Sequence, residues 1–156
     1  PGLRLIADGL GYRVDEIRER FDRVATDRDL HVAFGTAEAG TCGALRTQAI
    51  AVIDGREAII IEHVNRLAPD LGLEWGDRVD RPVYQVRIDG EPDIVCSMNA
   101  SLRDPGAAGS TMDAGAGAMV STAMRVVNAI PYVVQAEPGL LTALDLPLTV
   151  PRHALR

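Results

Sequence analysis

The chain has 156 residues, 16 of them basic and 22 acidic, which gives a net charge of -6 and a pI near 5.0. Because it is acidic, poor in aromatic residues and without a basic block, we expect neither nucleic acid nor an anionic membrane as a partner. All 16 basic residues are arginine, which excludes a lysine Schiff base and a P-loop lysine. The length and the 47% hydrophobic content favour a single domain over residues 1–156.

The two cysteines, Cys42 and Cys96, lie far apart, without CxxC spacing or clustered histidines. We therefore expect no metal site, free thiols and a cytoplasmic location. No uninterrupted apolar run approaches the ~18 residues of a membrane span, and the opening residues lack the charged-then-apolar pattern of a signal peptide, so we expect neither feature. Because the sequence starts at Pro1 within a helical pattern, we expect a piece of a longer protein.

In the first half, the opening ten residues favour a helix that ends at a Gly9–Gly11 break. Residues 12–26 leave two alternatives open, because their apolar spacing favours a helix whereas the neighbouring elements favour an edge strand. The clearest hairpin covers residues 44–67, where two β-rich runs flank the Asp54–Gly55 turn.

In the second half, a loop around Trp75 leads to another hairpin over residues 81–102, whose alternation predicts one buried face. Residues 103–117, rich in glycine and alanine, predict a mobile loop, and a helix follows from about Ala118. We expect the apolar stripe of this helix to pack against the sheet. The stripe comprises Met119, Ala123, Val126, Ile130 and Val133.

Together these elements predict an α+β fold with an open, mainly antiparallel β-sheet and one long late helix. Two glycine pairs, in Gly9-Leu10-Gly11 and Gly115-Ala116-Gly117, do not fit a dinucleotide fingerprint, because neither follows a strand and opens a helix. No GxSxG motif occurs, and the serines have no evident histidine and acid partners. No residue of this chain is therefore assigned a catalytic role.

Two candidate site residues lie in the first half. His63 stands near the end of an apolar strand, where it is either a hydrogen-bonded structural histidine or part of a substrate pocket. Trp75 lies on a loop, where its indole either walls a substrate pocket or caps the sheet. Both residues are candidates for substrate binding.

The remaining candidates lie in the helical stretch TAMRVVNAIPYVV, Thr122–Val134. Met124 and Asn128 share a helix face on which Arg125 is the only charged residue, so this face is expected to meet surroundings drier than bulk water. Pro131 predicts a bend or helix end. Thr122 and Met124 are candidates for substrate binding, and Asn128 for cofactor binding. Alternatively, Asn128 only ties down the backbone around Pro131.

Longer stretches of the sequence resemble a known family. They are GTAEAGTCGALRTQAIAVIDGREAIIIEHVNR, Trp75, the hairpin YQVRIDGEP, and TAMRVVNAIPYVVQAEPGLLTALDLP. This combination resembles the C-terminal half of dihydrodipicolinate reductase-like proteins. The nearest branch contains 2,4-diaminopentanoate dehydrogenase and the native NAD(P)H-dependent amine dehydrogenases.

The resemblance implies a longer enzyme in which an N-terminal Rossmann domain, missing here, binds NAD(P)H. The C-terminal half walls the pocket of a small-molecule substrate and makes the interface of a homo-oligomer, at least a dimer. Its long helix packs at the cofactor cleft, where Asn128 and Thr122 are expected to face nicotinamide and substrate. This chain alone is expected to bind no cofactor and to be inactive.

The sequence departs from true dihydrodipicolinate reductases, which carry His-His-x-x-Lys and Pro-Ser-Gly-Thr elements. The comparable region, ERFDRVATDRDLHVAFGT, has neither the histidine pair nor a lysine, so a role in lysine biosynthesis is not expected. The leading interpretation is the substrate and oligomerisation domain of an NAD(P)-dependent oxidoreductase acting on an amine, imine or carbonyl group. The alternatives are a stand-alone small-molecule binding module and a purely structural dimerisation domain.

Overall fold

The computed structural model describes residues 2–33, 35–76, 84–98 and 114–149. The chain divides into two compact units, Pro1–Arg78 and Val79–Arg156. The single domain predicted over residues 1–156 stays a prediction.

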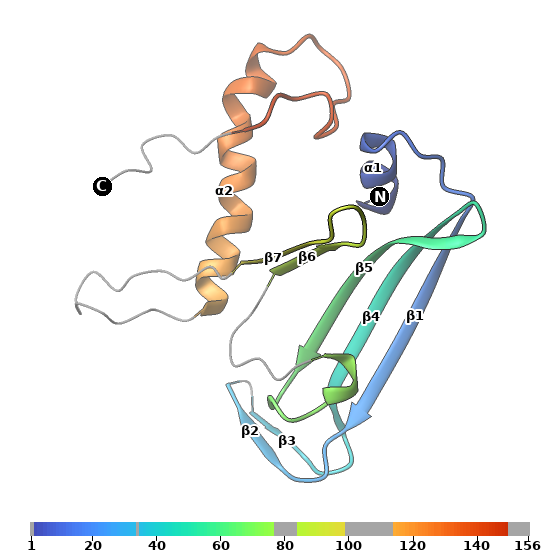
Figure 1. Ribbon diagram of the computed structural model, residues 1–156. Helices are drawn as coiled ribbons and strands as arrows, with labels where there is room; N and C mark the ends of the chain where they lie inside the picture. Colours follow the sequence, from blue (N-terminus) through green and yellow to red (C-terminus); the bar gives the residue numbers. More distant parts are fainter. Residues whose placement is uncertain (1, 34, 77–83, 99–113, 150–156) are drawn as a thin grey trace. The chain divides into compact units, whose positions relative to one another are not determined.

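The first unit is built on a three-stranded antiparallel sheet in the order β1-β4-β5, with β1 at Glu16–Ala25, β4 at Cys42–Ile53 and β5 at Arg56–Arg66 (Figure 1). The hairpin predicted around Asp54 and Gly55 is confirmed. These two residues have φ angles of 51° and 74°, and a two-residue turn of type I′ requires positive φ at both positions. This turn type is favoured in hairpins because its twist matches that of the flanking strands.

Strand β1 settles the alternative left open for residues 12–26 in favour of an edge strand. It pairs with β4 from Glu16 opposite Val52 to Val24 opposite Ala44. Most of its side chains are exposed, because an edge strand with polar residues on both faces has little to cover it. The three- and four-residue spacing of its apolar positions is therefore not a sign of a helix here.

The core of this unit lies on the central strand. Ile50, Ala51 and Val52 of β4 are each 3% exposed or less. Helix α1, Gly2–Gly9, contacts β4 and β5 and buries Leu3 and Ala7, which are one turn apart. The predicted opening helix and its glycine break are confirmed.

A second, smaller cluster lies where the chain leaves β5. It contains Ala44, Ala68 and Leu71 as buried members, with Trp75 packed against them. The 3-10 helix η1, Leu73–Trp75, carries the tryptophan. Two short paired strands, β2 at Leu30–Val32 and β3 at Gly35–Ala37, complete the described part of this unit.

The second unit contains the second predicted hairpin, formed by strands β6 at Tyr84–Ile88 and β7 at Ile94–Met98. The prediction that one face of this hairpin is buried is wrong, because every residue of both strands is exposed. Alternation alone shows that one face is apolar. Burial also needs a layer to cover that face, and an isolated two-stranded ribbon supplies none.

The long late helix α2 runs over Ala114–Gln135. It therefore includes the last four residues of the loop predicted at 103–117, while residues 103–113 lie outside the described residues. Of the bend or helix end expected at Pro131, the helix end is wrong, because the helix continues through it to Gln135, and the bend stays a prediction. Pro131 still leaves the carbonyl of Val127 without its helical N–H partner.

The apolar stripe of α2 is largely exposed, and its expected packing against the sheet stays a prediction. Met119 is 74% and Val126 69% exposed. By length and composition alone, the stretch Gly117–Gln135 is long and apolar enough to cross a membrane. One such helix is weak evidence of a span, because core helices of soluble proteins pass the same test. The α+β fold predicted for the chain, with antiparallel strands and one long late helix, is confirmed.

Candidate functional site

His63 and Trp75 lie on opposite faces of the sheet. The strand register places His63, and the contact with Arg46 places Trp75. Thr47 is directly opposite His63 on one side and Phe21 on the other, so these three side chains share what we call the Thr47 face. The preceding residue of β4, Arg46, points to the other side of the sheet, which we call the Arg46 face. Trp75 lies on the Arg46 face, with its ring centroid 5.6 Å from the Arg46 guanidinium carbon.

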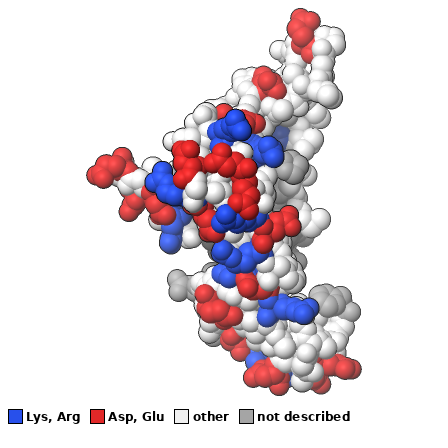
Figure 2. Space-filling view, turned by 90° about the vertical axis from the view of Figure 1, so that its right-hand side faces the viewer, with Lys and Arg blue, Asp and Glu red and all other residues white. Residues whose placement is uncertain are grey.

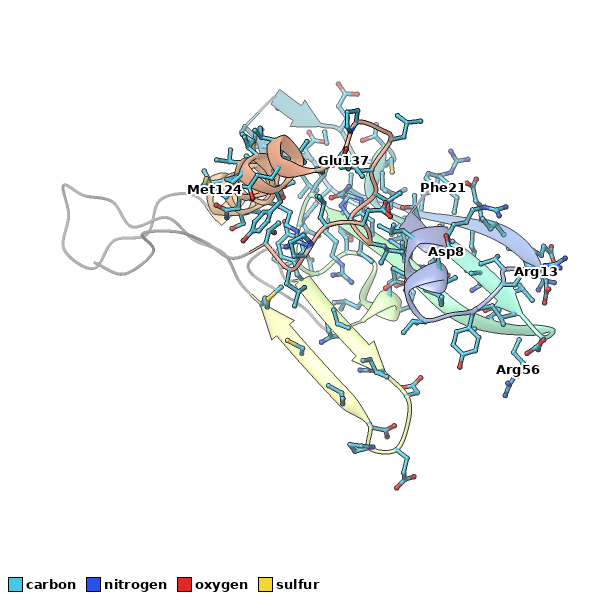
Figure 3. All side chains as sticks on the ribbon, turned by 90° about the horizontal axis from the view of Figure 1, so that it is seen from above. Asp8, Arg13, Phe21, Arg56, Met124 and Glu137 are labelled. Atoms are coloured by element: carbon cyan, nitrogen blue, oxygen red, sulfur yellow. The ribbon has the colours of Figure 1, made fainter. Side chains whose placement is uncertain are left out.

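On the Thr47 face, His63 is exposed and its ring has no hydrogen-bond partner among the described residues. A hydrogen-bonded core histidine does not fit this position. Phe21 is 61% exposed and stands out from β1 (Figure 3). An aromatic ring, a hydroxyl and an imidazole therefore lie in one row across the three strands. The assignment of His63 to substrate binding stays a prediction.

On the Arg46 face, the half-buried Trp75 packs on the small core and stacks on Arg46, which fits the alternative of a sheet cap. Gly72 brings the chain close to the ring, because a Cβ there would lie 2.7 Å from it. Arg66 holds the same loop by donating from Nε to the carbonyl of Leu71, at 2.8 Å. The position of the indole is thus fixed by several contacts.

The loop is also tied to the chain after β1. Arg28 donates from Nη2 to both carboxylate oxygens of Asp70, each at 2.8 Å. These hydrogen bonds, together with the neighbouring Asp27, raise the pKa of the Arg28 guanidinium. Arg66 also donates from Nη2 to the carbonyl of Gly76, at 3.3 Å, so the Arg28 and Arg66 contacts anchor both ends of the segment that carries Trp75.

A polar network that the sequence reasoning missed covers the Arg46 face. Arg46 donates from Nε and Nη2 to Asp22 Oδ2, at 2.9 and 2.6 Å. Gln48 joins the outer strands, since it accepts from Arg20 Nη1 at 3.0 Å and donates to Glu62 Oε2 at 2.6 Å. Figure 2 shows acidic and basic side chains interspersed on the side of the molecule that it displays. The sequence contained one indication of this network. The Asp54–Gly55 turn sets the register of β4 and β5, and this register puts Gln48 opposite Glu62.

The other predicted site residues lie on α2. Asn128 is half-buried, and its amide makes no side-chain hydrogen bond to any residue the structure describes. The alternative in which Asn128 ties down the backbone around Pro131 therefore does not fit. Met124, 41% exposed, lies one turn before Asn128 on the same helix face.

Thr122 lies about 120° around the helix from Asn128, so the two do not share a face. Its hydroxyl donates to the carbonyl of Ala118 at 3.0 Å. Ser121 donates in the same way to Gly117, at 2.9 Å. These two hydroxyls are already used within the helix, which sets them apart from the free amide of Asn128.

Two hollows lie within the separate units. One, of about 610 Å³, lies at the end of α1 and is lined by Arg4, Asp8, Tyr12 and Arg13 among others. The other, of about 400 Å³, is a groove between α2 and residues 139–149. Neither is lined by any of the five predicted site residues.

The described residues do not fit a pyrophosphate site. The Gly9–Gly11 break ends α1, and Gly115 and Gly117 lie inside α2, whereas a phosphate-binding turn must open a helix. In the part of the chain that the structure describes, no three His, Cys, Asp or Glu side chains are placed to hold a metal ion. Asn128, the residue predicted to bind cofactor, has an unused donor and an unused acceptor among the described residues, which a cofactor amide could satisfy.

The chain has recognisable relatives. Residues 2–155 match the family model of the 2,4-diaminopentanoate dehydrogenase C-terminal domain. The chain is 38% identical over 149 residues to an amine dehydrogenase of Streptomyces virginiae, a match that covers 94% of this chain and 39% of that protein. It is 31% identical over 150 residues to a 2,4-diaminopentanoate dehydrogenase of Acetoanaerobium sticklandii, covering 95% and 36%.

Among solved structures, the fold is similar to that of an amine dehydrogenase from Mycobacterium smegmatis, with a TM-score of 0.65 at 18% identity. That match covers 96% of this chain and 38% of the other. The chain thus spans less than half the length of the relatives that it matches. These findings confirm the resemblance stated from the sequence: the chain belongs to the 2,4-diaminopentanoate dehydrogenase C-terminal domain family.

Proposed function

We propose that this chain is the substrate-binding and oligomerisation domain of an NAD(P)-dependent oxidoreductase that acts on an amine, imine or carbonyl substrate. The observation that carries the proposal is the family match over residues 2–155. The names of the two sequence relatives, an amine dehydrogenase and a 2,4-diaminopentanoate dehydrogenase, support the class of reaction.

In the complete enzyme the nicotinamide supplies or accepts the hydride. The residues of this chain bind the substrate, orient its reacting carbon and exclude water. Asn128 is our candidate for the cofactor side of the site, because its half-buried amide has no hydrogen-bond partner among the described residues. A carboxamide would satisfy its donor and its acceptor together.

His63 is our candidate for the substrate side. Its ring is exposed in a row with Thr47 and Phe21, which offers one apolar surface and two hydrogen-bonding groups to a small molecule. Trp75 is supported less well as a pocket wall, because its ring is already stacked on Arg46.

We further propose that the domain associates with a second copy through the exposed sheet, as a homodimer in the cytoplasm. The support is that Ile17 and Phe21 are exposed on the Thr47 face, where a second copy would cover their apolar side chains. The exposed thiols of Cys42 and Cys96 fit a reducing compartment.

The test compares two proteins, the isolated chain and the complete polypeptide that carries it. We expect amine-dependent reduction of NAD(P)⁺, or the reverse reaction with a ketone and ammonia, from the complete protein only. Activity of the isolated chain above a protein-free blank would refute its assignment as an inactive half. A complete protein that binds small amines without any turnover would favour the stand-alone binding module instead.

A further inference from the structure

The groove in the second unit has a lining suited to one class of ligand. Helix α2 contributes Arg125, Ala129 and Val133, and the segment after it contributes Leu141 and Leu146. A volume of about 400 Å³ lies in the range of small-ligand sites, which are mostly apolar with a few polar groups that fix the orientation.

Arg125 is the one charged side chain among the described residues that line this groove. Its Nη1 donates to Thr149 Oγ1 at 2.7 Å, which fixes the guanidinium at the wall. Among the described residues, no acidic side chain forms an ion pair with Arg125. The remaining N–H groups of its guanidinium therefore donate no hydrogen bond to a described residue. A fixed guanidinium with free donors is suited to a carboxylate, whose two oxygens match the fork.

The opposite wall is held in shape by a local turn. The backbone N–H and the hydroxyl of Thr142 both donate to Asp145 Oδ2, each at 2.7 Å. These hydrogen bonds lower the pKa of Asp145. Asp145 is thus held in the turn as a carboxylate and does not line the groove, whose one charged lining residue among those described is Arg125.

We propose that this groove binds a small aliphatic carboxylate. The carboxylate lies on Arg125, and a chain of about six carbons lies along Ala129, Val133 and Leu146. None of the five predicted site residues lines this groove. The proposal does not depend on the redox reaction proposed above.

The experiment is a titration of the 156-residue chain with sodium hexanoate, followed by the backbone amide resonances of the groove residues. We expect saturable shifts there at millimolar concentration. Butyrate should bind roughly tenfold more weakly, because two buried methylenes are lost. Hexylamine, of the same length and opposite charge, should cause no saturable shift.

Two variants and one control complete the test. Arg125→Gln should weaken hexanoate binding about tenfold or more. Because Arg125 also holds Thr149, a second variant, Ala129→Leu, fills the groove and leaves that hydrogen bond in place. Arg87→Gln, an exposed arginine of β6 that does not line the groove, should bind as the unchanged chain does.

Three outcomes would overturn the proposal. They are the absence of saturable shifts with hexanoate up to about 10 mM, equal binding of hexylamine, and unchanged affinity in Arg125→Gln and Ala129→Leu. None of these results bears on amine-dependent reduction of NAD(P)⁺ by the complete protein, so the two proposals fail separately.

Discussion

Replacing Arg46 by glutamine tests whether the Arg46 face fixes the loop of Trp75. The side chain of Arg46 is 21% exposed, so its interactions are less screened than those of a surface pair. Losing two charge-assisted hydrogen bonds to one Asp22 oxygen should cost about 1–1.5 kcal/mol. Losing the contact with the Trp75 ring should add about 0.5–1 kcal/mol. We therefore expect a loss of about 2 kcal/mol in the free energy of unfolding of the first unit.

Trp75 makes this measurable, because it is the single tryptophan of the chain and its fluorescence reports on the first unit alone. With a urea dependence of about 1–2 kcal/mol per molar, the midpoint should fall by about 1–2 M. The matched control is Arg18→Gln, since the ion pair that Arg18 forms among the described residues is with Glu16 on its own strand, and both side chains are more than half exposed. It should change stability by less than about 0.5 kcal/mol. Equal midpoints for the two variants would refute the reasoning.

Three further predictions concern other parts of the chain. Gly43→Ala should destabilise the first unit by about 1–3 kcal/mol in thermal unfolding, because the added Cβ would lie 2.6 Å from Leu71 Cδ1; an unchanged melting temperature would contradict this. Asn128→Ala should weaken cofactor or substrate binding of the complete enzyme by about 1–3 kcal/mol and leave its melting temperature unchanged, since the amide has no partner among the described residues. A fall in melting temperature with unchanged binding would show a structural role instead. The hydrogen bonds from Thr142 lower the pKa of Asp145, so the ionised carboxylate stabilises the turn at pH values above 3.8, its ordinary pKa. This stabilisation is lost as the pH falls through the lower pKa that Asp145 has in the folded chain. The amide resonance of Thr142 should therefore titrate with a midpoint below pH 3.8, and Asp145→Asn should remove that titration.

The elements that the sequence predicted correctly are those fixed by local chemistry. Asp54 and Gly55 determine a tight turn, and the turn determines the pairing of the two strands that flank it. The break after α1 likewise follows from Gly11, which has a φ of 76°. Such features depend on neighbours within a few residues, so the sequence alone contains them.

The features that the sequence left open or missed depend on distant partners. The strand at residues 16–25 is set by its pairing with β4, which overrides the helical spacing of its apolar residues. The exposure of Met119 and Val126 depends on which layer covers α2, and a helical period specifies only that the face is apolar. Likewise, that Trp75 lies on a loop is visible in the sequence, whereas its stacking on Arg46 requires the register of three strands.

The alternation along the central strand also bears on how such a domain diverges. Arg46, Thr47 and Gln48 are consecutive, yet their side chains serve two surfaces that do not touch. A point substitution at Thr47 can alter the row of His63 while the ion pairs of Arg46 stay intact, and the reverse also holds. By contrast, an insertion or deletion of one residue within β4 would exchange the two surfaces beyond it. Lineages of this domain are therefore expected to vary these positions one at a time by substitution and to keep the length of this strand constant.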